Sequence, residues 1–184
     1  MKDSFRELHE QKTESERVYD GVLLHIDRDT VLLPDSSAAV RESVRHIGAV
    51  GIVAIDDSGR IILEKQFRYP VNDIILEIPA GKLDMPDEDR LSAAKRELRE
   101  ETGYTADCWT KIGDFFPAPA YSDEMITLFL ATELHTGMTE RDEDEFMEVF
   151  SIPFRDAVDL VYAGGIRDAK TQIAVLRAAR MINA

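Results

Sequence analysis

The sequence has one cysteine, four scattered histidines and no long apolar run, and each shortage excludes a class of protein. Cys108 has no second cysteine with which to form an intramolecular disulfide or a multi-cysteine zinc site. His9, His25, His46 and His135 show no HxH or HExxH spacing, which argues against zinc bound through histidine. No stretch reaches the roughly 18 apolar residues of a membrane helix, and the polar N-terminus lacks a signal-peptide pattern. We therefore expect a cytoplasmic protein with no membrane partner.

Positive charge is also scarce. The chain has 22 Lys and Arg against 36 Asp and Glu, a formal net charge of −14 and a pI of about 4.7. Because non-specific nucleic-acid binding needs a basic surface, we expect no nucleic-acid partner. An anionic ligand would need locally placed Arg and Lys, or metal ions, to overcome the acidic field. The length of 184 residues suits one domain with a full-sized core, or one domain plus an appendage.

The order of apolar and polar segments predicts a mixed α/β protein. Residues 1–17 are polar and are expected to form a frayed helix or a mobile arm, whereas 18–46 contain short apolar pieces typical of a small antiparallel sheet. The run IGAVGIVAID (47–56) indicates a buried strand, followed by a hairpin turn at Asp57-Ser58-Gly59. Further strands are expected at 60–70, 73–79, 126–134 and 145–153, and helices at 89–103, 154–164 and 169–182. Short turns join most strands, which favours a mixed sheet with helices on both faces.

The helix predicted at 89–103 has clear limits and a clear apolar face. Leu91, Ala94 and Leu98 fall at i, i+3 and i+7, which gives one apolar stripe. Asp89 is a suitable N-cap residue, and Gly103 suits the position just beyond the C-terminus.

The same helix carries three glutamates within RELREETG (96–103). Glu97 and Glu101 are four positions apart and share a helix face, where like charges repel by roughly 0.2–0.5 kcal/mol per pair. A hard cation such as Mg²⁺, which takes carboxylate, carbonyl and water oxygens, would relieve this repulsion. Glu97 and Glu101 are therefore candidate metal ligands, and Arg96 can pair with Glu100, which is its partner or an outer ligand. The alternative is a solvated acidic helix face.

The turn before the helix adds a possible backbone ligand. Gly81 lets the main chain approach closely, so the carbonyl of Ala80 is a further candidate.

Residues 81–104, GKLDMPDEDRLSAAKRELREETGY, resemble the Nudix box, G-x5-E-x7-R-E-U-x-E-E-x-G-U, where U is a bulky apolar residue. The second half is matched throughout, by Arg96, Glu97, Leu98, Glu100, Glu101, Gly103 and Tyr104. The first half has one extra residue between Gly81 and the helix. Counting back from Arg96 gives Glu88 as the first glutamate, whereas counting from Gly81 gives Asp87. We prefer Glu88, because a loop absorbs an insertion more easily than a helix.

Other segments are similar to the ADP-ribose pyrophosphatase branch of the Nudix hydrolases. They are QFRYP (66–70), EIPAGKLD (77–84), PAYSDE (119–124), EDEFMEV (143–149) and DAKT (168–171). Pro119 matches a characteristic proline of that branch, and Ala120 departs from the usual glycine. The resemblance implies a Nudix α/β/α sandwich with a mixed sheet over residues 47–184. It also implies a homodimer in which residues 1–46 form the dimerisation arm.

The resemblance implies substrate contacts for five residues. Arg68 matches an arginine that contacts substrate, and Arg41 with Glu42 matches a pair that reaches the substrate across the dimer interface. Glu124 matches a glutamate near the phosphates or the terminal ribose, and Tyr121 would line the pocket. Taken alone, each has an ordinary reading as an edge residue, a surface ion pair or a packing tyrosine.

Two further groups of acidic residues belong to the resemblance. Glu77, in E-x-P-A-G, is expected to be structural more than catalytic. The acidic stretch 139–148 would by itself be a solubilising loop. In this branch, however, it carries a catalytic glutamate, so we assign Glu143 as general base and Glu145 as metal ligand, with the reverse assignment open.

Together these features predict Mg²⁺-dependent hydrolysis of ADP-ribose to AMP and ribose 5-phosphate. Two or three ions are expected, with Mn²⁺ as a possible substitute. GDP-mannose, oxidised ADP-ribose or another nucleoside diphosphate sugar is the main alternative, and a nucleoside triphosphate substrate is less favoured. A non-catalytic module that senses ADP-ribose ranks lower, because all the box glutamates are present.

Overall fold

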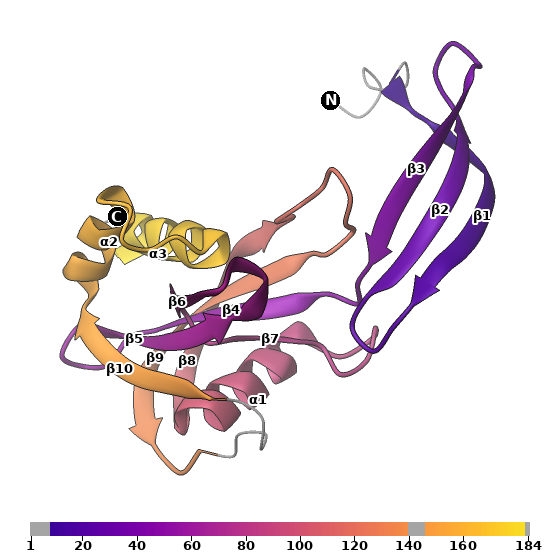
Figure 1. Ribbon diagram of the computed structural model, residues 1–184. Coiled ribbons are helices and arrows are strands. Elements are labelled where there is room, and N and C mark those ends of the chain that lie inside the picture. The colour runs from indigo at the N-terminus through magenta and orange to yellow at the C-terminus, as the bar shows by residue number, and fades with distance from the viewer. Residues whose placement is uncertain (1–7, 140–145, 183–184) are drawn as a thin grey trace. The chain divides into compact units, whose positions relative to one another are not determined.

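The computed structural model describes residues 8–139 and 146–182, and the chain divides into two compact units (Figure 1). The first unit comprises residues 1–46 with 118–124, and the second comprises 47–117 with 125–184. In the described part of the chain, no helix has both the length and the apolar character needed to cross a membrane.

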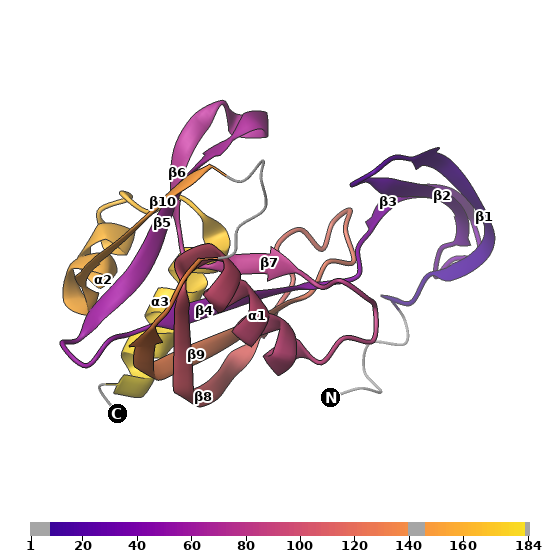
Figure 2. The same cartoon turned by 90° about the horizontal axis from the view of Figure 1, so that it is seen from below.

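The first unit is a three-stranded antiparallel sheet in the order β1-β2-β3, which curves across its width (Figure 2). Its strands are β1 (Gln11–Asp20), β2 (His25–Leu32) and β3 (Ala38–Arg45). The antiparallel sheet expected within 18–46 is thus confirmed. The frayed helix or mobile arm expected at 1–17 is wrong for 11–17, which lie in β1, and residues 1–7 lie outside the described residues. Every residue of β1 is exposed, so no apolar alternation marks it. Cross-strand pairing holds it instead, including Arg17 Nε to Asp27 Oδ1 at 2.5 Å.

The second unit combines two sheets with three α-helices. One sheet has the order β7-β4-β9-β8 and the other β10-β5-β6. The strands are β4 (Ala49–Ala54), β5 (Arg60–Arg68), β6 (Asp73–Glu77), β7 (Ala80–Lys82), β8 (Tyr104–Phe115), β9 (Ile126–Thr136) and β10 (Met147–Pro153). The helices are α1 (Arg90–Thr102), α2 (Phe154–Tyr162) and α3 (Ala169–Ile182), with a short 3-10 helix at Tyr69–Val71.

Strand β4 lies at the centre of the second unit and explains the dense β-branched run in the sequence. It pairs parallel with β9 and antiparallel with β7, and all six of its residues are buried. Its side chains alternate: Val53 packs in the core beneath α2 and α3, whereas Val50 and Ile52 pack in the core beneath α1. Helices α1 and α3 both contact β4 from these two sides (Figure 1). The predicted mixed sheet with helices on both faces is confirmed.

Three features of the strands differ from the expectation. Residues 80–82, where the sequence predicts a turn at Gly81, form strand β7. The turn at Asp57-Ser58-Gly59 forms, with Gly59 at φ 76°. It is not a hairpin within one sheet, because β4 and β5 belong to different sheets and are linked at the turn by an isolated bridge between Ile55 and Ile61. Strand β8 was not predicted at all. Its residues are mostly polar and half-buried or exposed, because β8 forms the edge of its sheet and, among the described strands, pairs only with β9.

Candidate active site

Helix α1 begins and ends where the sequence predicted. The side chain of Asp89 accepts a hydrogen bond from the Ser92 amide at 2.8 Å, and Gly103 adopts φ 75° at the C-terminus. Ala94 and Leu98 are fully buried in the core shared with β4. This packing fixes the rotation of the helix about its axis and so decides which residues face the neighbouring strand.

The helix turns Glu97 and Glu101 toward strand β7. Both are buried, at 9% and 6% exposure. The amide of Ala80 donates to Oε2 of Glu101 at 3.0 Å. A Cβ atom on Gly81 would lie 2.0 Å from Cδ of Glu97, so only glycine leaves space for that carboxylate. The backbone at Gly81 therefore approaches another group closely, as expected, and that group is the carboxylate of Glu97.

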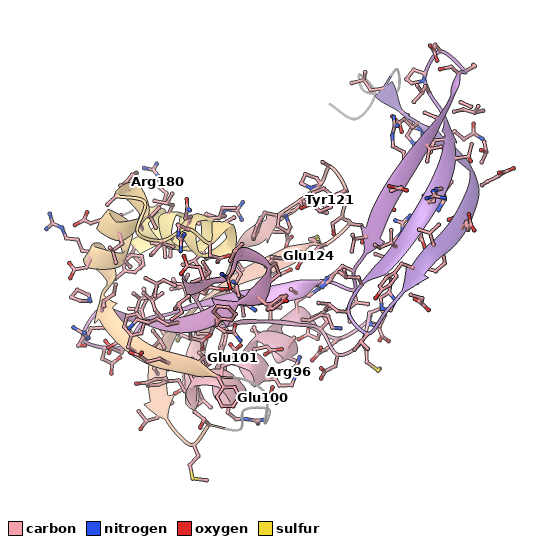
Figure 3. All side chains as sticks on the ribbon, in the orientation of Figure 1. Arg96, Glu100, Glu101, Tyr121, Glu124 and Arg180 are labelled. Carbon is pink, nitrogen blue, oxygen red and sulfur yellow. The ribbon has the colours of Figure 1, made fainter. Side chains whose placement is uncertain are left out.

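Arg96 links the acidic residues around the start of the helix; Figure 3 labels it with Glu100 and Glu101 on α1. Its guanidinium lies 2.8 Å from Glu97 Oε1, 3.2 Å from Glu100 Oε2 and 3.4 Å from Glu88 Oε1. Burial alone would lower the pKa of Arg96, but Glu97, Glu88 and Glu100 outweigh it and raise the pKa well above its usual range. Arg96 thus stays charged and orients three carboxylates.

The loop before α1 bears on the choice between Asp87 and Glu88. Glu88 Oε2 accepts from the Asp84 amide at 2.7 Å, and the same side chain reaches Arg96. Asp87 is exposed. The structure therefore brings Glu88 to the helix glutamates, which supports the register counted back from Arg96.

The donor groups at this site suit a hard cation. Two buried carboxylates, Glu97 and Glu101, face strand β7 at Gly81, where no side chain covers the backbone. Carboxylate and carbonyl oxygens are the ligands that Mg²⁺ prefers. Within residues 8–139 and 146–182, no three His, Cys, Asp or Glu side chains are grouped closely enough to hold a metal by themselves. Glu143 and Glu145, assigned from the sequence as base and ligand, lie outside the described residues.

A pocket of about 650 Å³ lies where β5 and β6 meet the start of α3. Two of its lining residues, Arg68 and Glu77, form two hydrogen bonds, from Nε to Oε1 at 2.7 Å and from Nη2 to Oε2 at 2.9 Å. Lys170 also pairs with Glu77, whose side chain is only 5% exposed, whereas Arg68 remains 44% exposed. The residues lining the pocket are Arg68, Pro70, Val71, Ile75, Glu77, Arg167, Asp168, Ala169 and Lys170.

The Glu77 carboxylate should contribute to stability in a pH-dependent way. Burial raises the pKa of Glu77, but Arg68 and Lys170 lower it by more, so the native pKa lies below the ordinary 4.5. Because the pKa is lowered in the native state, the ionised carboxylate stabilises the fold at pH values above its ordinary pKa. This contribution is lost as the pH falls through the native pKa. Glu77→Gln should therefore cost about 3 kcal/mol of unfolding free energy at pH 7, because Arg68 and the buried Lys170 both lose a charged partner and Lys170 keeps only Asp168. The difference should shrink below about pH 4.

Denaturant unfolding from pH 7 to pH 3 measures this effect. Asp73→Asn is the matched control on β6, because Asp73 pairs with Arg167 at 2.6 Å where both side chains are more than half exposed. That variant should lose about 0–1 kcal/mol. A Glu77→Gln cost that does not change with pH would contradict the charged state assigned to Glu77.

Four of the predicted substrate contacts belong to the first unit. On β3, Arg41 forms an ion pair with Glu10 at 2.6 Å, and Glu42 pairs with Arg28 at 3.1 Å. The other two, Tyr121 and Glu124, lie in the segment before β9 (Figure 3). The Tyr121 side chain is exposed, and its carbonyl accepts from the Val44 amide at 2.7 Å. Glu124 lies 3.9 Å from Nδ1 of His46.

Sequence reasoning gave no role to the start of α3, although the structure connects it to the pocket and to β6. Asp168 accepts from the Thr171 amide at 2.9 Å, the arrangement of an N-cap, and Lys170 pairs with Glu77. The signal was available in part. An aspartate directly before an apolar periodic segment is an N-cap signal and indicates a helix start.

The structure has the α/β/α sandwich that the box implies, and in it helix α1 presents the buried Glu97 and Glu101 to the strand that carries Gly81. The model of the NUDIX domain matches residues 45–172 of this chain. The chain therefore belongs to the Nudix family.

Relatives and a solved structure resemble almost the whole chain. It is 43% identical to the ADP-ribose pyrophosphatase of Bacillus subtilis, over 92% of each chain. It is also 37% identical to the methanol dehydrogenase activator of Bacillus methanolicus, over 91% of this chain and 92% of that protein. A crystal structure described as an ADP compounds hydrolase superposes with a TM-score of 0.85 at 25% identity, covering 96% of both chains.

Proposed function

We propose that this Nudix hydrolase cleaves the pyrophosphate bond of ADP-ribose with Mg²⁺, giving AMP and ribose 5-phosphate. The observation that carries the proposal is the buried pair Glu97 and Glu101 against Gly81 of β7. Its support in the comparisons is the 43% identity to an ADP-ribose pyrophosphatase over nearly the whole chain. Acidic residues alone would repel a diphosphate, so the proposal includes cations.

In this proposal, Glu97 and Glu101 hold Mg²⁺ together with the Ala80 carbonyl, Glu100 and the added ligand Glu145. Two or three ions, or Mn²⁺ in their place, would neutralise the phosphate charge and polarise the phosphoryl oxygens. Arg96 restrains the carboxylates of Glu97 and Glu100, which supports their orientation before any ligand binds. Gly81 is required because a side chain there would occupy the space of the Glu97 carboxylate.

Protein side chains would bind the substrate and take up the proton. Arg68 keeps 44% of its side chain exposed while Glu77 fixes its Nε edge, so it is oriented to bind a phosphate. Glu143 would accept the proton of the attacking water, with Glu145 as the alternative base.

Oligomeric state and compartment complete the proposal. Arg41, Glu42, Tyr121 and Glu124 would contact the substrate in a homodimer, in which residues 1–46 form the dimerisation arm and 47–184 the hydrolase domain. The compartment would be the cytoplasm.

Two other functions remain as alternatives. Hydrolysis of GDP-mannose or another nucleoside diphosphate sugar would use the same acidic site with a different base or sugar contact. A sensing module would bind ADP-ribose without turnover. The complete set of box glutamates favours an enzyme over that module.

A substrate panel scored by kcat/KM tests the proposal. With Mg²⁺ present, ADP-ribose should exceed GDP-mannose, NADH and diadenosine polyphosphates by at least ~10-fold, which corresponds to about 1.4 kcal/mol of transition-state discrimination. A higher kcat/KM for GDP-mannose would move the assignment to that substrate. Tight ADP-ribose binding without turnover of any compound would support the sensing module.

A further inference from the structure

The segment that joins β6 to β7 carries the proposed backbone ligand and crosses from one sheet to the other. Strand β6 ends at Glu77 in the sheet β10-β5-β6, and β7 begins at Ala80 in the sheet β7-β4-β9-β8. Only Ile78 and Pro79 connect them. Both residues lie between the two named strands, so contacts from the neighbouring elements set their position.

Three elements hold this segment at successive residues. The Ile78 amide donates to Thr171 Oγ1 of α3 at 2.9 Å. The Pro79 carbonyl accepts from β4 at 2.9 Å, and the Ala80 amide donates to Glu101 of α1 at 3.0 Å. Helix α3 thus contacts the segment at Ile78, two residues before Ala80, whose amide contacts Glu101.

Thr171 is held firmly enough to position the segment. It is fully buried, its hydroxyl donates to Asp168 Oδ2 at 2.6 Å, and its amide donates to the same carboxylate at 2.9 Å. Because its only hydroxyl proton is directed to Asp168, its oxygen is free to accept from the Ile78 amide. Asp168 also lies 3.1 Å from Lys170, which in turn pairs with Glu77, the last residue of β6.

We propose that Thr171, oriented by Asp168, is a positioning residue that sets the cation affinity of the site through the Ile78–Gly81 backbone. The inference rests on the proposed function, because the cation is the one that function requires. The clearance at Gly81 is small: its missing Cβ would lie 2.0 Å from Glu97 Cδ. A shift of the segment would therefore displace the Ala80 carbonyl and amide relative to Glu97 and Glu101.

Amide exchange and Mn²⁺ titration of the full-length protein test the proposal without substrate. Thr171→Val keeps the shape of the side chain but removes the acceptor. Exchange of the Ile78, Ala80 and Gly81 amides should become at least ~10-fold faster, and the Mn²⁺ Kd should rise ~10-fold, as for the loss of a group that supports a ligand. Thr171→Ser, which retains the hydroxyl, should restore both within about twofold. Asp168→Asn, which keeps an N-cap but weakens the orientation of Thr171, should give a smaller change in the same direction.

Val175→Ala is the control for a purely structural effect. Val175 is fully buried on the same helix and packs in the same apolar core as Ile78, but its side chain has no polar atom with which to hydrogen-bond the segment. It should lower Tm while leaving the Mn²⁺ Kd unchanged. An Mn²⁺ Kd for Thr171→Val equal to that of Val175→Ala overturns the proposal, whatever the exchange rates. Wild-type protein that binds Mn²⁺ but hydrolyses no substrate would refute the proposed function only, since the Mn²⁺ titration still decides the role of Thr171.

Discussion

Replacing Glu101 by glutamine should reduce Mg²⁺-dependent hydrolysis by ~10³-fold or more, because several kcal/mol of charge stabilisation depend on a properly held cation. The fold should survive. Glutamine keeps an oxygen that can accept the hydrogen bond from the Ala80 amide, which Glu101 accepts at 3.0 Å. It lacks the negative charge that attracts the cation. Single-turnover rates at saturating ADP-ribose, with Mg²⁺ varied, measure the loss.

Glu148→Gln provides the matched control for this variant. Glu148 is a 67% exposed carboxylate on β10 that pairs only at the surface with Lys65. Its replacement removes the same charge from the chain without touching α1, so activity should stay within about twofold of wild type. A near-normal rate for Glu101→Gln, with Mg²⁺ dependence intact, would remove the metal assignment from this residue.

Gly81→Ala should leave the protein folded but reduce kcat/KM by ~10²-fold, the scale expected for a misplacement of about 1 Å at a catalytic group. The added Cβ would lie 2.0 Å from Cδ and 2.1 Å from Oε1 of Glu97. The end of a flexible side chain yields more easily than a backbone, so the carboxylate should move out of the site. Circular dichroism and Tm would report the fold, and Mn²⁺ titration the weakened cation binding.

A double-mutant cycle identifies the cause of that loss. In a Glu97→Gln background, Gly81→Ala should add little, because the group it displaces is already disabled. Gly59→Ala should show the opposite pattern. Its Cβ would meet nothing within 4 Å, but its φ of +76° disfavours alanine, so stability should fall by about 1 kcal/mol with activity unchanged. Fully multiplicative losses in the Gly81 and Glu97 cycle would show that Gly81 acts through something else.

The helix α1 and the central strand β4 followed from the sequence because local patterns determine them. Asp89 and Gly103 cap α1 by interactions within a few residues. The apolar run of β4 indicates burial on both faces whatever the topology. For the same reason, the pairing of Glu97 with Glu101 on one face could be predicted from their spacing alone.

Features that depend on distant contacts could not be predicted in this way. Strand β1 is exposed along its whole length and is stabilised by pairing with β2, which leaves no apolar period to detect. The pair Glu77 and Lys170 joins residues 93 positions apart. In the sequence alone, Glu77 and Lys170 look like ordinary surface residues, and only the fold shows that their charges are buried. The hydrogen bond of Thr171 to the Ile78 amide has the same separation and the same explanation.

The measurement that tests the central claim most directly is ³¹P NMR of ADP-ribose incubated with the wild-type protein, with Mg²⁺ and then with excess chelator. The diphosphate resonances should be replaced by those of AMP and ribose 5-phosphate when Mg²⁺ is present, and should persist when it is chelated. Unchanged ADP-ribose in the presence of Mg²⁺, or equal turnover with the metal chelated, would contradict the account.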